Sequence, residues 1–143
     1  MSRPTVTFEM QTVEQANLDL VKSLLAAFSN GNVLGIRGIL TPDVKFRFPG
    51  YNALSGEFKG IDAALGLLSR IFQWNGGSTR IRLHDVLANE QHGVLLYTVT
   101  ARHGDRTIRY KYMDLYHFRD GQISEVWGVA ADDARAFDEF YSE

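Results

Sequence analysis

The sequence predicts an α+β domain built around a curved antiparallel sheet. Two stretches, residues 13–28 and 61–72, repeat apolar side chains at the spacing of an amphipathic helix. Four apolar-rich segments then fill the second half of the chain, at 79–87, 94–102, 107–118 and 123–130. Only short turns separate these segments, and such turns join antiparallel strands, because parallel neighbours need a long crossover. Helices that precede a meander of strands indicate a sheet with helices packed on one face.

Three helices are predicted before the meander and one after it. The first begins after Thr12, which opens a capping-box pattern, and breaker residues at 29–32 end it. A short second helix is predicted at 33–40, and residues 75–78 end the third. The last helix is predicted at 132–141, where acidic side chains can cap its first turn.

A further strand is predicted between the second and third helices. Residues 44–48 alternate apolar and basic side chains, so Phe46 and Phe48 point to the same face. A turn is predicted before this strand at 41–43, and a loop of small and polar residues after it at 51–60.

Length and charge favour one domain without a nucleic-acid site. The 143 residues fit a single domain covering the whole chain, with residues 1–11 as an N-terminal extension. The formal net charge of -2 gives no electrostatic reason to bind nucleic acid, which normally requires a basic surface.

The residue types present also limit the chemistry. The chain has no cysteine, which excludes disulfides and thiolate nucleophiles and is compatible with a cytoplasmic location. Its four histidines show no paired spacing of the kind that holds a metal, so we expect no metal site. No apolar run approaches the length of a membrane span, so no membrane partner is expected.

The segment 107–118 carries most of the functional information. Strand alternation places Tyr110, Tyr112, Asp114 and Tyr116 on one face. A carboxylate among aromatic rings is costly if it is dry and unpaired. It must therefore find hydrogen bonds, take up a proton, or lie at a pocket that a ligand can reach.

Several short segments in a fixed order carry a family resemblance. They are residues 29–32, Asp43-Val44, Leu54-Ser55-Gly56, Gly60-Ile61 and the His-Phe-Arg-Asp-Gly turn at 117–121. Together with the order of helices and strands, they resemble the SnoaL-like group of the nuclear transport factor 2-like superfamily. The resemblance covers about residues 13–129.

The resemblance implies a cone, in which three N-terminal helices and a curved antiparallel sheet enclose an apolar pocket. Members include polyketide cyclases, isomerases and hydrolases, usually without metals or organic cofactors, and others are non-catalytic binding or interaction modules. The family commonly forms homodimers through the outer, convex face of the sheet. Met113, Leu115 and Tyr97 are expected on that face, which would otherwise expose an apolar patch.

Two activities of related families do not fit the residues at the corresponding positions. The three proton-handling positions of ketosteroid isomerases fall at Leu24, Phe48 and Tyr116, and the first two of these cannot transfer protons. Epoxide hydrolases of this superfamily need an arginine and two aspartates around one water, but Arg109 and Asp114 point to opposite faces.

Together with these residues, the resemblance implies a cofactor-free cyclase or isomerase acting on an apolar, oxygen-bearing small molecule. Asp114 is predicted to move the proton, and Tyr116, Tyr112 or His84 to stabilise the charge that develops on oxygen. The residues expected to contact the substrate are Tyr112, Tyr110, Phe48, Phe46, Leu24, Trp74 and Tyr51. Two alternatives remain open, a non-catalytic binding protein for an apolar metabolite and a dimeric interaction module whose cavity is simply its core.

Overall fold

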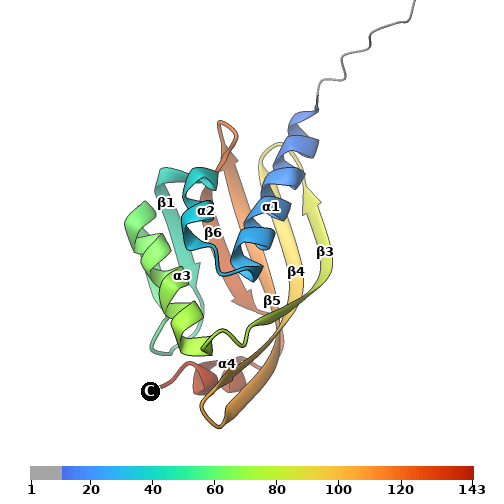
Figure 1. The fold of residues 1–143 in the computed structure, drawn as a ribbon. Helices are drawn as coiled ribbons and strands as arrows, with labels where there is room; N and C mark the ends of the chain where they lie inside the picture. Colours follow the sequence, from blue (N-terminus) through green and yellow to red (C-terminus); the bar gives the residue numbers. More distant parts are fainter. Residues whose placement is uncertain (1–10) are drawn as a thin grey trace, which may run out of the picture.

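The computed structural model describes residues 11–143, so the predicted extension at 1–11 lies outside the described residues apart from Gln11. Within this range the chain forms helices and strands in the order drawn in Figure 1. The helices are α1 (Val13–Ser29), α2 (Val33–Ile36), α3 (Ile61–Asn75) and α4 (Ala134–Phe140). The strands are β1 (Leu40–Phe48), β2 (Gly56–Lys59), β3 (Arg80–Ala88), β4 (His92–His103), β5 (Arg106–Arg119) and β6 (Gln122–Ala130). The predicted α+β class with three N-terminal helices is confirmed.

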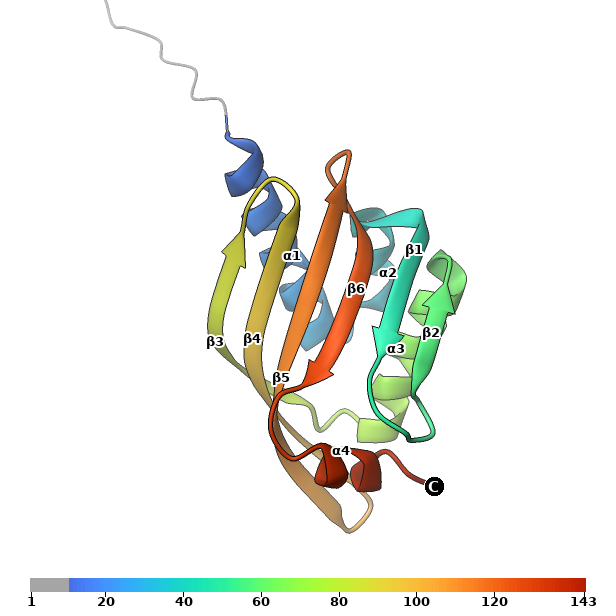
Figure 2. The ribbon, with the colours of Figure 1, turned by 180° about the vertical axis from the view of Figure 1, so that it is seen from behind.

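The strands form one sheet in the order β2-β1-β6-β5-β4-β3 (Figure 2). Strands β3 to β6 form the predicted antiparallel meander. Strand β1, however, runs parallel to β6, so the sheet is mixed and the prediction of a purely antiparallel sheet was wrong at this pair. Most of the chain lies between these two strands, and no short turn therefore constrains their relative direction. The predicted loop at 51–60 also contains strand β2, which pairs with β1 at the edge of the sheet.

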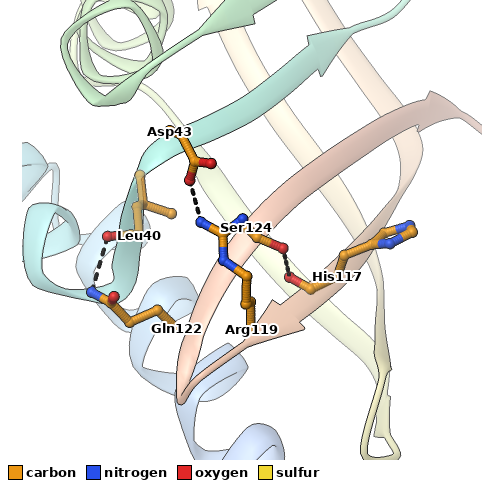
Figure 3. A network of polar contacts seen from close by, with 6 residues as sticks. All are labelled: Leu40, Asp43, His117, Arg119, Gln122 and Ser124. Atoms are coloured by element: carbon orange, nitrogen blue, oxygen red, sulfur yellow. Dashed lines mark hydrogen bonds and ion pairs between the residues drawn. The ribbon is translucent and has the colours of Figure 1, made fainter.

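Side-chain contacts support the irregular start of β1 (Figure 3). The register between β1 and β6 shifts between Leu40 and Lys45, in the region where a turn was predicted. The side chain of Gln122 donates to the carbonyl oxygen of Leu40 at 3.1 Å, and Arg119 forms an ion pair with Asp43. These contacts from the β5–β6 turn bind the part of β1 where the ladder is interrupted, so the chain remains in the sheet there.

Helices α1 and α3 lie over one face of the sheet, and the view from behind shows the other face without a helix across it (Figures 1 and 2). The backbone N–H of Gln15 donates to the Thr12 hydroxyl at 3.1 Å, which confirms the predicted N-cap of α1. Helix α2 is shorter than the predicted 33–40, and a 3₁₀ turn at Arg37–Ile39 leads from it into β1. Helix α4 lies at one end of the sheet beside β5.

The two faces of the sheet have different roles. The covered, concave face contributes Phe46, Phe48, Tyr110, Tyr112 and Tyr116 to the core, as strand alternation predicts. The opposite, convex face exposes further apolar side chains. No helix within residues 11–143 has both the length and the apolar character needed to cross a membrane.

Candidate functional site

A cavity lies between α1, α3 and the concave face of the sheet. The cavity volume is about 60 Å³, measured as the space open to the centre of a water-sized sphere. The lining is mostly aromatic and aliphatic with a few polar groups, which is the usual composition of a small-molecule site. The lining includes Leu24, Phe46, Phe48, Asn75, Thr79, Tyr97, Tyr110, Tyr112, Asp114 and Tyr116.

Asp114 is held by two tyrosines from the sheet. The hydroxyl of Tyr97 on β4 donates to Asp114 Oδ2 at 2.8 Å, and the hydroxyl of Tyr116 donates to the same oxygen at 3.0 Å. Asp114 Oδ1 has no hydrogen bond from any residue that the structure describes. The carboxyl group is therefore fixed by one oxygen, while the other is available to a molecule in the cavity.

The surroundings of Asp114 shift its pKa toward neutrality. Burial raises the pKa of Asp114 from 3.8 to about 6, and the hydrogen bonds from Tyr97 and Tyr116 limit the rise. Burial also raises the pKa of both tyrosines well above 10, so each remains a protonated donor at neutral pH. A carboxyl group with a pKa near 6 can both accept and return a proton under physiological conditions.

The hydroxyl of Tyr112, the next tyrosine along β5, forms no hydrogen bond with any other side chain or backbone group of residues 11–143. The Tyr110 hydroxyl, by contrast, bonds the Tyr141 hydroxyl at 2.8 Å. The space for the Tyr112 hydroxyl exists because residue 128 on β6 is glycine. A Cβ at Gly128 would collide with that hydroxyl and lie 3.0 Å from the carbonyl oxygen of Arg47. The structure thus leaves one tyrosine hydroxyl on this face able to donate to a ligand.

Seven of the ten predicted site residues lie together in this cavity. They are Asp114, Tyr116, Tyr112, Tyr110, Phe48, Phe46 and Leu24. Strand alternation on β1 and β5, together with the apolar stripe of α1, accounts for their convergence. Tyr116 was predicted to present its hydroxyl to the substrate. In the structure this hydroxyl donates to Asp114 instead.

The other three predicted site residues lie outside the cavity lining. His84 is exposed on edge strand β3, as are its neighbours Leu83 and Asp85, and the register shift between those two leaves it unpaired. Tyr51 is 95% exposed in the loop after β1. The Trp74 indole N–H donates to the carbonyl oxygen of Phe140 at 2.9 Å, and its ring stacks on His103 with centroids 4.1 Å apart. Trp74 therefore packs toward α4.

Four polar members of the lining were not predicted from the sequence: Tyr97, Asn75, Thr79 and Arg47. Tyr97 was predicted on the convex face, but it is buried and bonds Asp114. The alternation of Leu95, Tyr97 and Val99 was a usable signal, because all three are buried on one face. Asn75 was assigned only a helix-ending role, and local sequence gives no signal that its side chain lines a cavity.

Comparisons with known proteins place the chain in a family. The family model described as a SnoaL-like domain matches residues 21–126. An uncharacterised protein of Mycobacterium tuberculosis is 30% identical over 122 residues, which are 85% of this chain and 93% of that protein.

Solved structures share the fold at lower identity. Bal32a, from a soil-derived mobile gene cassette, superimposes with a TM-score of 0.86 at 21% identity, covering 91% of this chain and 99% of that one. A putative SnoaL-like polyketide cyclase from Jannaschia sp. CCS1 gives 0.77 at 16% identity, covering 95% and 98%. TerC, co-crystallised with polyporic acid, gives 0.74 at 20% identity, covering 88% and 98%. With the family model matching most of its length, the chain belongs to the family of SnoaL-like domains.

Proposed function

We propose that this protein is a cofactor-free cyclase or isomerase for an apolar, oxygen-bearing small molecule. The observation that carries the proposal is the carboxyl group of Asp114, held through Oδ2 by Tyr97 and Tyr116 with Oδ1 left for a ligand. Its pKa of about 6 suits proton transfer in either direction near neutral pH. The apolar walls would orient the substrate and exclude water.

The proposed reaction begins with proton removal from a carbon next to a carbonyl group. Asp114 Oδ1 takes the proton and becomes a carboxylic acid, while the Tyr112 hydroxyl donates to the developing enolate oxygen. In an isomerisation, Asp114 returns the proton to a different carbon. In a cyclisation, the enolate carbon forms a bond to a second carbonyl carbon, and Asp114 protonates the resulting alkoxide. Either sequence balances without an oxidant, reductant or co-reactant.

The comparisons support the class of substrate. One structural neighbour is described as a putative polyketide cyclase, and another was co-crystallised with polyporic acid. The mixture of aromatic walls and few polar groups around Asp114 suits a ligand that is apolar but carries oxygen.

Deuterium exchange tests the proposed chemistry without knowledge of the natural substrate. 2-Tetralone is a bicyclic ketone with exchangeable protons beside its carbonyl group, and ¹H NMR in D₂O follows their loss. The wild-type protein should accelerate exchange above the buffer rate. Asp114→Asn keeps an acceptor for Tyr97 and Tyr116 but removes the base, so enzyme-dependent exchange should fall by about 10²–10⁴-fold.

A matched control separates the site from the general effect of a carboxylate. Asp105 is exposed in the turn between β4 and β5, and Asp105→Asn should exchange at the wild-type rate. Thermal melting of each variant verifies folding. If 2-tetralone binds in the cavity but wild-type protein does not accelerate exchange, the catalytic proposal is wrong and the protein is a binding protein.

We also propose that the protein forms a homodimer through the convex face. Apolar side chains from three adjacent strands lie opposite one another there: Met113 pairs with Leu96 and Val129, and Leu115 pairs with Val94 and Trp127. Trp127 and Val129 are each 40% exposed. A continuous apolar sheet face of this kind is stabilised by burial against a partner, and a second copy presents the same surface.

A further inference from the structure

The cavity has a second polar region, distant from Asp114 along the strands. Tyr110 and Asp114 are four residues apart on β5, which separates their backbone positions by about 13 Å. The Tyr110 hydroxyl bonds Tyr141, and Asn75 and Thr79 line the cavity with Tyr110. The polar groups around Tyr110 therefore lie apart from those around Asp114, with Tyr112 between them on β5.

Asn75 is unusual among the buried polar side chains. It is 1% exposed, its Nδ2 donates to Thr79 Oγ1 at 2.8 Å, and its Oδ1 has no hydrogen-bond partner. Two other buried side-chain atoms within residues 11–143 share this property, Thr41 Oγ1 and His117 Nε2, but neither residue lines the cavity. A buried polar atom without a partner destabilises the fold, so its retention beside a cavity points to a partner that comes with the ligand.

We infer that Asn75 and Thr79 form a second subsite of the cavity, which binds a hydroxyl group at the end of the ligand remote from Asp114. An O–H group donates to Asn75 Oδ1 and can accept from the neighbouring Thr79 hydroxyl, which satisfies the unpaired atom. The ligand class is thus an elongated apolar molecule with an oxygen function at each end. This inference rests on the proposed small-molecule function, but it does not depend on proton transfer by Asp114.

Neighbouring contacts hold the Asn75 side chain in place. Asn75 is the last residue of α3, and its carbonyl oxygen accepts from the backbone N–H of Ser78 at 2.9 Å. Burial raises the pKa of Tyr141, while hydrogen bonding with Tyr110 and Asn75 opposes the rise. The hydrogen bond to Thr79 fixes the buried amide, which is the preorganisation that a selective subsite needs.

Two biphenyl probes test the subsite. 4-Hydroxybiphenyl carries one hydroxyl and 4,4′-dihydroxybiphenyl carries one at each end, and isothermal calorimetry gives Kd for both. We expect wild-type protein to bind the dihydroxy probe about tenfold more tightly, the gain of one hydrogen bond. Asn75→Leu replaces the amide with an apolar group of similar size. The ratio of the two Kd values should then fall to about two, because the symmetric probe can bind in either of two equivalent orientations.

A second variant keeps the test decisive if Asn75→Leu does not fold. Thr79→Val replaces the hydroxyl with a methyl group of similar size, and it should also reduce the gain. A tenfold gain that persists in folded Asn75→Leu or Thr79→Val would overturn the subsite.

The outcomes also separate the subsite from the catalytic proposal. Normal exchange of 2-tetralone with no preference for the dihydroxy probe in wild-type protein refutes the subsite alone. A preference that depends on Asn75, with no exchange of 2-tetralone, refutes the catalytic proposal alone.

Discussion

At the scale of single residues, the chemistry of the site depends on opposing effects at Asp114. Burial among aromatic rings favours the neutral acid, while hydrogen bonds from Tyr97 and Tyr116 favour the carboxylate. Burial is the larger effect, and the pKa settles at about 6 instead of 3.8. The ionised carboxyl group is thus kept in the fold at some cost to stability.

This cost predicts how stability varies with pH. Because the pKa of Asp114 is raised on folding, its stabilising contribution is fully present below about pH 4 and is lost as the pH rises through about 6. The shift from 3.8 to about 6 corresponds to about 3 kcal/mol. Asp114→Asn does not ionise, so the free energy of unfolding of the variant relative to wild type should increase by up to about 3 kcal/mol between about pH 4 and pH 8.

Urea unfolding of both proteins across this pH range measures the difference. The comparison cancels the titration of every other group that the two proteins share. A difference that stays constant with pH would show that the pKa of Asp114 is not raised in the folded protein.

At the scale of secondary structure, β6 supplies an empty position beside the site. Gly128 is buried on the concave face between Val126 and Ala130, and its missing side chain gives room to the Tyr112 hydroxyl. Glycine weakens a strand interior, so its presence there is explained by the close approach of a neighbouring group.

Replacement of this glycine should disturb both stability and the site. Gly128→Ala forces the Tyr112 ring or the backbone near Arg47 to move, which should cost about 1–3 kcal/mol and reduce 2-tetralone exchange. Gly66→Ala is the matched control, because Gly66 is exposed within α3 and a Cβ added there would meet no atom within 4 Å. That change should stabilise the protein by about 0.5–1 kcal/mol and leave exchange unaltered.

Thermal melting and the exchange assay provide both readouts. If Gly128→Ala and wild type have equal stability and equal exchange rates, then neither folding nor exchange depends on the present position of the Tyr112 hydroxyl.

At the scale of the whole molecule, helices cover one face of the sheet and leave the other open (Figure 2). The open face carries the apolar pairs around Met113 and Leu115. The cavity and the proposed dimer interface therefore lie on opposite sides of the same sheet, so each can be tested without altering the other.

A charge on the convex face should separate the proposed dimer. Static light scattering of wild-type protein should give about twice the chain mass of 16.1 kDa. Val129→Glu places a carboxylate among the apolar pairs and should give the monomer mass at the same concentration. Leu34→Glu, at a side chain 79% exposed on α2, should remain dimeric. A wild-type mass near the 16.1 kDa of one chain at micromolar concentration would refute the dimer.

The sequence by itself determined the parts of this protein that depend on local periodicity. The helices, the meander and the shared face of Tyr110, Tyr112, Asp114 and Tyr116 all follow from the spacing of side chains along one element. The resemblance to SnoaL-like proteins, which the family model confirms, also rests on the order of such elements.

The tertiary structure decided what depends on contacts between distant segments. The parallel pairing of β1 with β6 joins strands whose register no local pattern sets, because no short turn connects them. The position of β3 at the edge of the sheet leaves His84 exposed, and packing toward α4 removes Trp74 from the cavity. Asn75 ends a helix in the sequence, but only the folded chain brings its side chain to the wall beside Tyr110, because that contact requires α3 to close over the sheet.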